Sequence, residues 1–166
     1  MQSTIDNTQD VLDSRETIGR IEELESDRKA LLEEVETAKA AFGEDSDLIC
    51  PPTNADEQVA LAAAMQAQTE AEAALAGWDE DNLAELDSLK SLAEQASCSP
   101  DWQYGETLVR DSHFTTYAEE LAEDCGMIVR NATWPYTCID WSLAARFLQM
   151  DYFRVDFAGI DYWVHA

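Results

Sequence analysis

The chain has 166 residues, with 35 aspartates and glutamates against 10 lysines and arginines, so its formal net charge is −25. A nucleic-acid backbone and an anionic membrane surface are both negatively charged. The composition therefore excludes unaided binding to the first, argues against the second, and favours a cationic partner. Apolar residues make up 46% of the sequence, which is enough for a folded core.

No apolar run approaches the roughly 18–20 residues that span a bilayer. The first residues, MQSTIDNTQDVLDS, are polar and acidic and lack the apolar segment of a signal peptide. We therefore expect a cytoplasmic protein. The cysteines are dispersed without a CxxC spacing, so we expect reduced thiols. They are Cys50, Cys98, Cys125 and Cys138.

The N-terminal part of the chain predicts a long helix. Residues 1–12 are expected to be frayed. Over residues 14–42, apolar side chains then recur at the a and d positions of a heptad. These positions hold Ile21, Leu24, Leu31, Val35, Ala38 and Phe42. Arg28 interrupts the repeat, and Gly43 followed by Pro51-Pro52 is expected to end the helix.

Two further helices are expected before residue 100. The second covers residues 55–76, where alanine predominates, and Gly77 is expected to end it. The third covers residues 81–96 and carries leucines at three-residue spacing. Because the connection between the first two helices is short and rich in turn residues, we favour an antiparallel hairpin. A dimeric coiled coil is the competing use of the same apolar stripe.

Aromatic residues mark a change of character near Pro100, because 13 of the 15 follow it. A small core needs aromatic bulk. We therefore place a boundary between an acidic helical region, residues 1–99, and a small α+β module, residues 100–166. The first region has 24 acids and 6 bases, and the second has 11 acids and 4 bases. Most of the negative charge is thus expected on helices outside the module.

The module is expected to contain helices packed on a short antiparallel sheet. A strand is predicted over residues 107–110 and a helix over residues 112–125. A second helix is predicted over residues 141–150, with Asp140 as its N-cap. Its inward-facing residues are expected to be Leu143, Ala144, Phe147 and Leu148. Alternating apolar residues on both sides of Ala158-Gly159 predict a terminal β-hairpin. The fold class predicted for the whole chain is α+β.

No pattern of catalytic residues stands out. The two histidines, His113 and His165, have no thiols at ligand spacing, and Cys125 is expected to pack in the core at a helix end. Glycine-rich nucleotide loops and a GxSxG nucleophile turn are absent from the sequence. We therefore expect a protein that is not an enzyme, with no catalytic residue, no metal site and no cofactor.

The arrangement of acids is the remaining feature. Residues 22–36 hold seven acids and two bases over about 21 Å of helix. That is one net charge per roughly 4 Å, against one per about 1.7 Å on duplex DNA, so helical carboxylates can imitate a phosphate track. The predicted partner-binding residues are Glu22, Glu23, Asp27, Glu33, Glu34, Glu36, Asp79, Glu80, Asp81, Glu119, Glu120 and Glu123. Two alternatives stay open: a merely solvated helix face, and adaptation to high intracellular salt.

A series of aromatic, cap and core positions runs through residues 102–164. It comprises Asp111, Ser112, Phe114, Tyr117, Ala118, Leu121, Ala122, Asp124, Gly126, Trp134, Pro135, Ile139, Asp140, Trp141, Ala144, Ala145, Arg146, Leu148, Asp151, Tyr152, Val155, Gly159 and Tyr162. In this pattern the segment resembles the last part of the ArdA-type antirestriction proteins, and more closely a group of short acidic proteins of phages and plasmids. The multi-domain body of the ArdA type is absent, and the helices of residues 1–99 replace it.

The resemblance implies an acidic protein that inhibits a DNA-handling defence enzyme by occupying its DNA site. Together with the charge, it predicts a non-catalytic DNA mimic from a phage or another mobile element, acting in the cytoplasm of a bacterial host. Its partner would be a basic nucleic-acid-binding protein, either a restriction enzyme or a CRISPR effector. The alternative is an assembly or adaptor protein whose coiled-coil arm forms a homodimer or docks on a partner.

Overall fold

The computed structural model describes residues 5–42, 55–129 and 133–166. The chain divides into two compact units. One is Glu22–Asp87, which we call the helical unit. The other combines Met1–Ile21 with Ser88–Ala166, and we call it the mixed unit. Long helices with a small antiparallel sheet make the fold class α+β, as predicted. Among the described residues, no helix is both long and apolar enough to cross a membrane.

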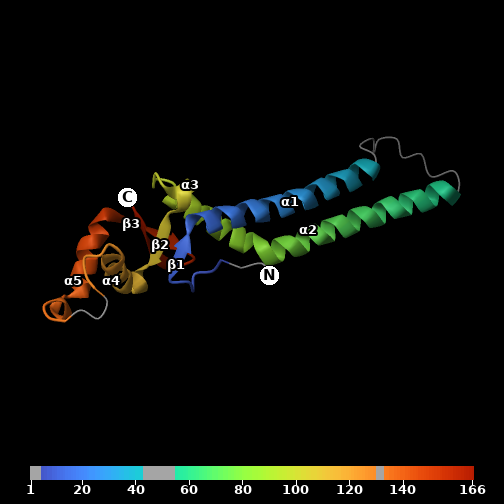
Figure 1. The fold of residues 1–166 in the computed structure, drawn as a ribbon. Coiled ribbons are helices and arrows are strands. Elements are labelled where there is room, and N and C mark those ends of the chain that lie inside the picture. Colours follow the sequence, from blue (N-terminus) through green and yellow to red (C-terminus); the bar gives the residue numbers. More distant parts are fainter. Residues whose placement is uncertain (1–4, 43–54, 130–132) are drawn as a thin grey trace. The chain divides into compact units, whose positions relative to one another are not determined.

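The helical unit is built from α1 (Ser14–Phe42) and α2 (Ala55–Ala96), which lie side by side (Figure 1). Arg28 of α1 contacts Asp79 of α2, whereas Lys39, further along α1, contacts Glu72, which comes earlier in α2. The two helices are therefore antiparallel. Leu24 and Val35 on α1 and Leu86 on α2 are buried. The heptad stripe is therefore used inside the chain, and the predicted hairpin is confirmed. The predicted stops at Gly43 and Pro51-Pro52 lie outside the described residues.

The prediction of a separate third helix is wrong, because α2 continues through Gly77 to Ala96. A glycine inside a helix costs only about 1 kcal/mol relative to alanine. That cost is smaller than the loss of several backbone hydrogen bonds and of the packing on α1. A β-carbon added at Gly77 would meet no atom within 4 Å, so no close approach demands glycine there either.

The mixed unit contains a four-stranded antiparallel sheet in the order β1-β2-β4-β3. Its strands are β1 (Val11–Asp13), β2 (Thr107–Arg110), β3 (Tyr152–Phe157) and β4 (Ile160–His165). The predicted strand over residues 107–110 and the terminal β-hairpin are confirmed. In the register, Leu12 pairs with Leu108, Val109 with Trp163, and Val155 with Tyr162.

The expectation that residues 1–12 are frayed is wrong for residues 5–12, which belong to this unit and contribute to its sheet, and residues 1–4 lie outside the described residues. β1 pairs with β2, and the side chains of Ile5 and Leu12 are buried. A three-residue strand has too little periodicity to be recognised in the sequence. Its position depends on the unpaired edge of β2, which lies about one hundred residues further along the chain.

The start of α1 and the end of α2 also belong to the mixed unit. The buried Ser14 accepts a hydrogen bond at its Oγ from the backbone N–H of Glu106, at 2.7 Å. Gln95 donates its side-chain Nε2 to the carbonyl of Asp156 and accepts the N–H of Asp156 at its Oε1, at 3.1 and 2.9 Å. This amide pairing satisfies the outer edge of β3 at that position. The sequence-based boundary at residue 100 therefore lies inside this unit.

Helices α4 (Phe114–Asp124) and α5 (Trp141–Leu148) pack against each other in the mixed unit. The short elements around them are α3 (Trp102–Gly105), η2 (Asp111–His113), η3 (Tyr136–Cys138) and η4 (Gln149–Asp151). Asp140 caps α5 as predicted, because its Oδ1 accepts the N–H of Leu143 at 3.0 Å. The predicted helix over residues 112–125 is confirmed. Its first turn is the 3₁₀ helix η2, and the α-helix itself begins at Phe114.

Phe114 is the centre of the core in the mixed unit. Its ring lies edge-on to Tyr152 and Trp163, with centroids 5.1 and 5.9 Å apart, within the range of favourable aromatic pairs. Val109, Ala118 and Ala145 complete the cluster. Two predicted inward-facing residues of α5 are in fact exposed, Leu143 at 45% and Phe147 at 64%. The small Ala145 faces the core instead, which rotates the buried face of α5 by about one position.

Candidate functional site

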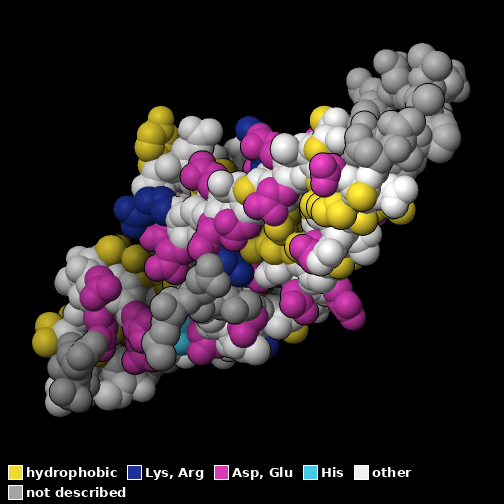
Figure 2. All heavy atoms as spheres, turned by 90° about the vertical axis from the view of Figure 1, so that its right-hand side faces the viewer, with side chains coloured by type: hydrophobic (Ala, Val, Ile, Leu, Met, Phe, Trp, Pro, Cys, Tyr) yellow, Lys and Arg dark blue, Asp and Glu magenta, His cyan; other side chains and the backbone are white. Residues whose placement is uncertain are grey.

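The helical unit carries most of the negative charge of the protein. Its 66 residues include 19 acids and 3 bases, whereas the 100 residues of the mixed unit include 16 acids and 7 bases. The respective net charges are −16 and −9. Figure 2 shows many acidic side chains and few basic ones on the face turned to the viewer, interspersed with hydrophobic and other side chains. Within the helical unit, 16 of the 19 acids and all three bases belong to α1 and α2, and the other three acids belong to residues 43–54, outside the described part of the chain.

The twelve predicted partner-binding residues fall into two groups, one on each unit. Nine lie on α1 and α2, and three lie on α4 of the mixed unit. Ten of the twelve are exposed, and Asp79 and Glu123 are half-buried. The nine on the helical pair are Glu22, Glu23, Asp27, Glu33, Glu34, Glu36, Asp79, Glu80 and Asp81, and the three on α4 are Glu119, Glu120 and Glu123.

The antiparallel pairing places acids of α1 and acids of α2 along the same stretch of the hairpin. Residues 22–36 of α1 hold seven acids and two bases. Glu72 of α2 lies opposite Lys39, so the part of α2 opposite this segment is residues 73–85, which hold four acids and no base. At about 1.5 Å per residue, this net charge of −9 occupies roughly 21 Å. One net charge per roughly 2 Å is close to the value of about 1.7 Å for duplex DNA.

Arg28, which interrupts the heptad, has a partner on the opposite helix. Its Nε donates to Oδ1 of Asp79 at 2.8 Å, and its Nη2 donates to Oδ2 at 3.4 Å. This hydrogen bonding holds the pKa of the Asp79 carboxyl below its usual value. Asp79 is therefore engaged within the hairpin, where it sets the register of the helices. Sequence spacing alone placed it among the surface acids.

The two lysines of α1 make weaker ion pairs. Lys29 lies 3.8 Å from Glu33 on the same helix, and Lys39 lies 3.9 Å from Glu72 on α2. All four side chains are about half or more exposed, so each pair contributes little to stability. Both lysines lie on α1 with Arg28, so the three cations of the unit are on one helix. In the described part of α2 that belongs to the helical unit, all of the charged residues are acids.

The residues considered for catalysis and metal binding are scattered. Nδ1 of His113 lies 3.9 Å from Oδ2 of Asp10, and His165 stacks edge-on against Tyr152. Among the residues that the structure describes, no group of three or more histidine, cysteine or carboxylate side chains is placed to hold a metal ion. The expectation that the protein is not an enzyme stays a prediction.

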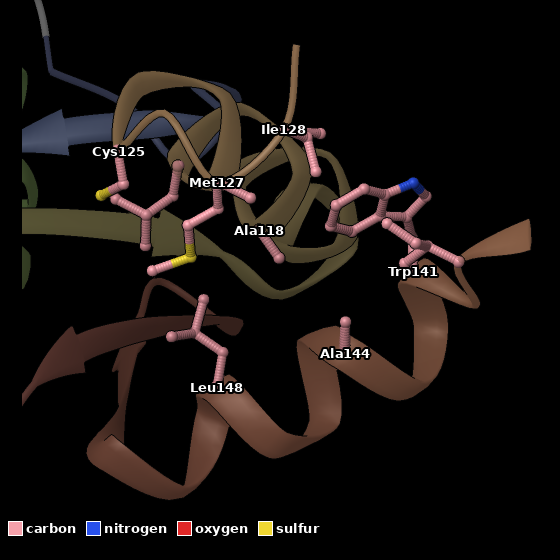
Figure 3. A pocket seen from close by; sticks show the side chains of 10 residues that line it. Ala118, Cys125, Met127, Ile128, Trp141, Ala144 and Leu148 are labelled. Atoms are coloured by element: carbon pink, nitrogen blue, oxygen red, sulfur yellow. The ribbon is translucent and has the colours of Figure 1, made fainter. Parts of the chain in front are cut away.

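One feature that the sequence did not reveal is an apolar pocket between α4 and α5, with a volume of about 360 Å³ (Figure 3). Met127 and Leu148 point toward each other across it, and the ring of Trp141 closes one end. Cys125, predicted as a core residue, is exposed and lines this pocket. The available sequence signal was the helical spacing of Ala118, Leu121, Ala122 and Cys125 on α4, which line the pocket.

Comparisons with protein-family models, curated proteins and solved structures found no match to this chain. The resemblance of residues 102–164 to ArdA-type proteins therefore stays a prediction. Functional inference depends on the charge and shape of the two units themselves.

Proposed function

We propose that the protein is a non-catalytic inhibitor that binds the basic nucleic-acid-binding surface of a bacterial defence enzyme. The helical unit would occupy that surface as a mimic of DNA. The observation that supports this proposal is the charge spacing of the paired segments of α1 and α2, which approaches the spacing of phosphates along a duplex. A surface made to bind phosphates would attract such a pair of helices.

The physical consequences of this charge are specific. Long-range attraction between a net charge of −16 and a basic groove speeds association, and dissolved salt weakens it. Sixteen of the nineteen carboxylates of this unit belong to helices held by the buried Leu24, Val35 and Leu86, so little conformational entropy is lost when the helices bind. A rigid acidic pair of helices is thus a better mimic than a disordered acidic tail.

The ArdA-like pattern of the mixed unit supports the choice of target class. Proteins of that type counter restriction, so a restriction enzyme or a CRISPR effector of the host is the expected partner. The protein would then belong to a phage or plasmid and act in the bacterial cytoplasm. No nucleic acid, membrane or cofactor is needed for this activity.

Affinity capture followed by a cleavage assay tests the proposal. The protein is immobilised, a lysate of the bacterial host is applied at low salt, and bound proteins are eluted with duplex DNA. The expected result is recovery of one DNA-binding enzyme whose DNA cleavage the free protein inhibits. Capture of many basic proteins without selectivity would show ion exchange only.

Two matched triple variants then locate the surface. Glu22→Gln, Glu34→Gln and Glu36→Gln together neutralise exposed acids of α1 and should raise the half-inhibitory concentration by about tenfold or more. Glu94→Gln, Asp101→Asn and Asp151→Asn remove the same charge from the mixed unit and should change it by less than about threefold. Unchanged inhibition by the α1 variant contradicts mimicry, and equal effects of both variants mean that only net charge matters.

A second candidate function is an adaptor whose helical pair docks on another protein. The observation that favours it is a set of exposed apolar side chains on the same helices, namely Leu32, Val59, Leu61 and Met65. Sedimentation of the purified protein distinguishes the two functions. A concentration-dependent dimer that is lost with Val59→Ser and Met65→Ser favours the adaptor, whereas a monomer that inhibits the captured enzyme favours mimicry.

A further inference from the structure

The pocket between α4 and α5 has a chemistry that the proposed function does not use. It is lined by alkyl, sulfur and indole groups from α4, α5 and the segment after α4 (Figure 3). Sites for polar small molecules carry several placed hydrogen-bonding groups that fix the orientation of the ligand. Here the lining is made of residues such as Leu121, Met127, Ile128 and Leu148. The pocket therefore fits apolar side chains better than a polar metabolite.

The apolar surface extends from the pocket along α5. Trp141, Ala144 and Leu148 line the pocket at helical spacing. Phe147 of α5 and Met150 of the following η4 are exposed at 64% and 77%. Aromatic and methionine side chains in this setting are enriched in protein interfaces. An apolar pocket and exposed apolar side chains of the same helix and the turn after it, on a chain this acidic, indicate a site for another protein.

Charge beside the pocket defines the occupant. On α4, Ala118, Leu121, Ala122 and Cys125 line the pocket. At 100° per residue, the exposed Glu119 and Asp124 flank this stripe on either side, Glu120 and Glu123 lie on the opposite face, and α4 contains no base. An apolar floor with an acidic border is complementary to a surface that combines apolar residues with lysine or arginine. An acidic partner would be repelled at that border.

We infer that this pocket binds an amphipathic basic helix of the partner protein. Apolar side chains of that helix, at i, i+3 or i+4, and i+7, enter between α4 and α5, and its lysines and arginines face the acids of α4. The 11 residues of α4 and 8 residues of α5 are about 16 and 12 Å long, which matches two to three turns of a bound helix. This inference rests on the proposed function, because it gives the basic target a second contact that supplies specificity.

A pair of synthetic peptides tests the inference. The first is a leucine–lysine helix of about 18 residues with leucines at i, i+3, i+4 and i+7, and the second has the same composition with the leucines dispersed around the helix. Binding to the full-length protein at 150 mM salt is followed by tryptophan fluorescence and by NMR shifts of residues in α4 and α5. The amphipathic peptide should bind about tenfold or more tightly than the dispersed one.

Variants in the mixed unit locate the contact. Phe147→Ser changes an exposed residue, and Ala144→Met fills the pocket. Each substitution should lower the affinity for the amphipathic peptide by about tenfold. Glu119→Gln with Glu120→Gln should weaken both peptides by about threefold, with a smaller effect at high salt. The fold of each variant is checked by near-ultraviolet circular dichroism. Because Phe147 is exposed, its variant keeps the test valid even if Ala144→Met does not fold.

The α1 triple variant separates this inference from the proposed function. It should bind the amphipathic peptide with an affinity within about twofold of the parent, because the pocket is unchanged. If the α1 triple variant weakens peptide binding and Phe147→Ser does not, the pocket is not the binding site. That outcome leaves the proposed DNA mimicry unaffected. Equal binding of both peptides overturns the inference. A dimer that Phe147→Ser abolishes without peptide also overturns it, because the occupant is then a second copy of the chain.

Discussion

The two units of this protein form their cores in different ways. In the mixed unit, large side chains such as Phe114, Leu108 and Tyr162 are almost completely buried between a sheet and short helices. In the helical unit, a narrow seam that includes Leu24, Val35 and Leu86 is buried, and most other positions face solvent. The unit with the smaller core carries the larger net charge.

This difference shows how a chain with a charge of −25 can fold. Carboxylates cannot be buried without a large desolvation cost, so a strongly acidic sequence needs an architecture with much exposed surface per residue. A pair of long helices provides this, because each helix buries only one stripe. The mixed unit contains most of the aromatic residues, and the helical unit contains more of the acids.

The largest expected effect comes from removing the centre of the aromatic core. Phe114→Ala should cost about 3–5 kcal/mol in the mixed unit, because the cavity loses contacts with Tyr152 and Trp163. Urea unfolding followed by near-ultraviolet circular dichroism measures it. The control is Phe147→Ala, which changes an exposed residue of α5. It should change the free energy of unfolding by less than about 0.5 kcal/mol. Equal costs for the two variants would contradict the assignment of the core.

Alkaline pH should destabilise the mixed unit selectively, because all five tyrosines lie there. Burial, with a contribution from the nearby Tyr117 hydroxyl, raises the pKa of Tyr152 far above its usual value of 10.0, and burial also raises the pKa of Tyr162. The stabilisation is therefore present below pH 10 and is lost as the pH rises further.

Urea midpoints measured between pH 8 and pH 12 check this expectation. Tyr152→Phe removes one titrating group and should make the alkaline loss smaller. Tyr104→Phe, which changes an exposed tyrosine, should leave the loss unchanged. If both variants lose stability as steeply as the parent, burial of the Tyr152 hydroxyl is not the cause.

Two glycines should respond in opposite directions to the same substitution. Gly77→Ala should stabilise the helical unit by about 0.5–1 kcal/mol, because Gly77 lies inside α2 and a β-carbon meets nothing there. Gly126→Ala should destabilise the mixed unit by about 1 kcal/mol, because Gly126 has a φ of +70° beyond the end of α4. Thermal unfolding monitored at 222 nm measures both. A loss of stability on Gly77→Ala would mean that α2 is interrupted at that residue.

The smallest effect concerns the Arg28–Asp79 ion pair. Asp79→Asn should lower the unfolding midpoint of the helical unit slightly at pH 7, because the charge-assisted hydrogen bonds are lost. The pKa of Asp79 is lowered by Arg28, so this stabilisation is present above the usual value of 3.8 and is lost as the pH falls below it. The difference between parent and variant should therefore disappear in acid.

Asp81→Asn is the matched control, because Asp81 is an exposed acid two residues further along α2. It should leave the midpoint unchanged or raise it, since it relieves repulsion among neighbouring carboxylates. Identical behaviour of the two variants between pH 3 and pH 7 would mean that the ion pair does not hold the helices in register.

Local sequence patterns were sufficient for much of this fold. The heptad spacing predicted α1, and the short, turn-rich connection after it favoured the hairpin over a dimeric coiled coil. The Asp140 cap predicted the start of α5, and the alternation around Ala158-Gly159 predicted the terminal hairpin. These features depend on residues close together in the chain, where side-chain period and capping chemistry determine the backbone. The separation of acids from aromatic residues was also visible in the sequence.

Other features were decided by contacts between residues far apart. β1 exists because β2 offers an unpaired edge, and α2 passes through Gly77 because it packs along α1 on both sides of that residue. The role of Asp79 depends on Arg28, and the exposure of Phe147 depends on Ala145 facing the core. In each case the local preference is worth about 1 kcal/mol or less, so the tertiary contact determines the outcome.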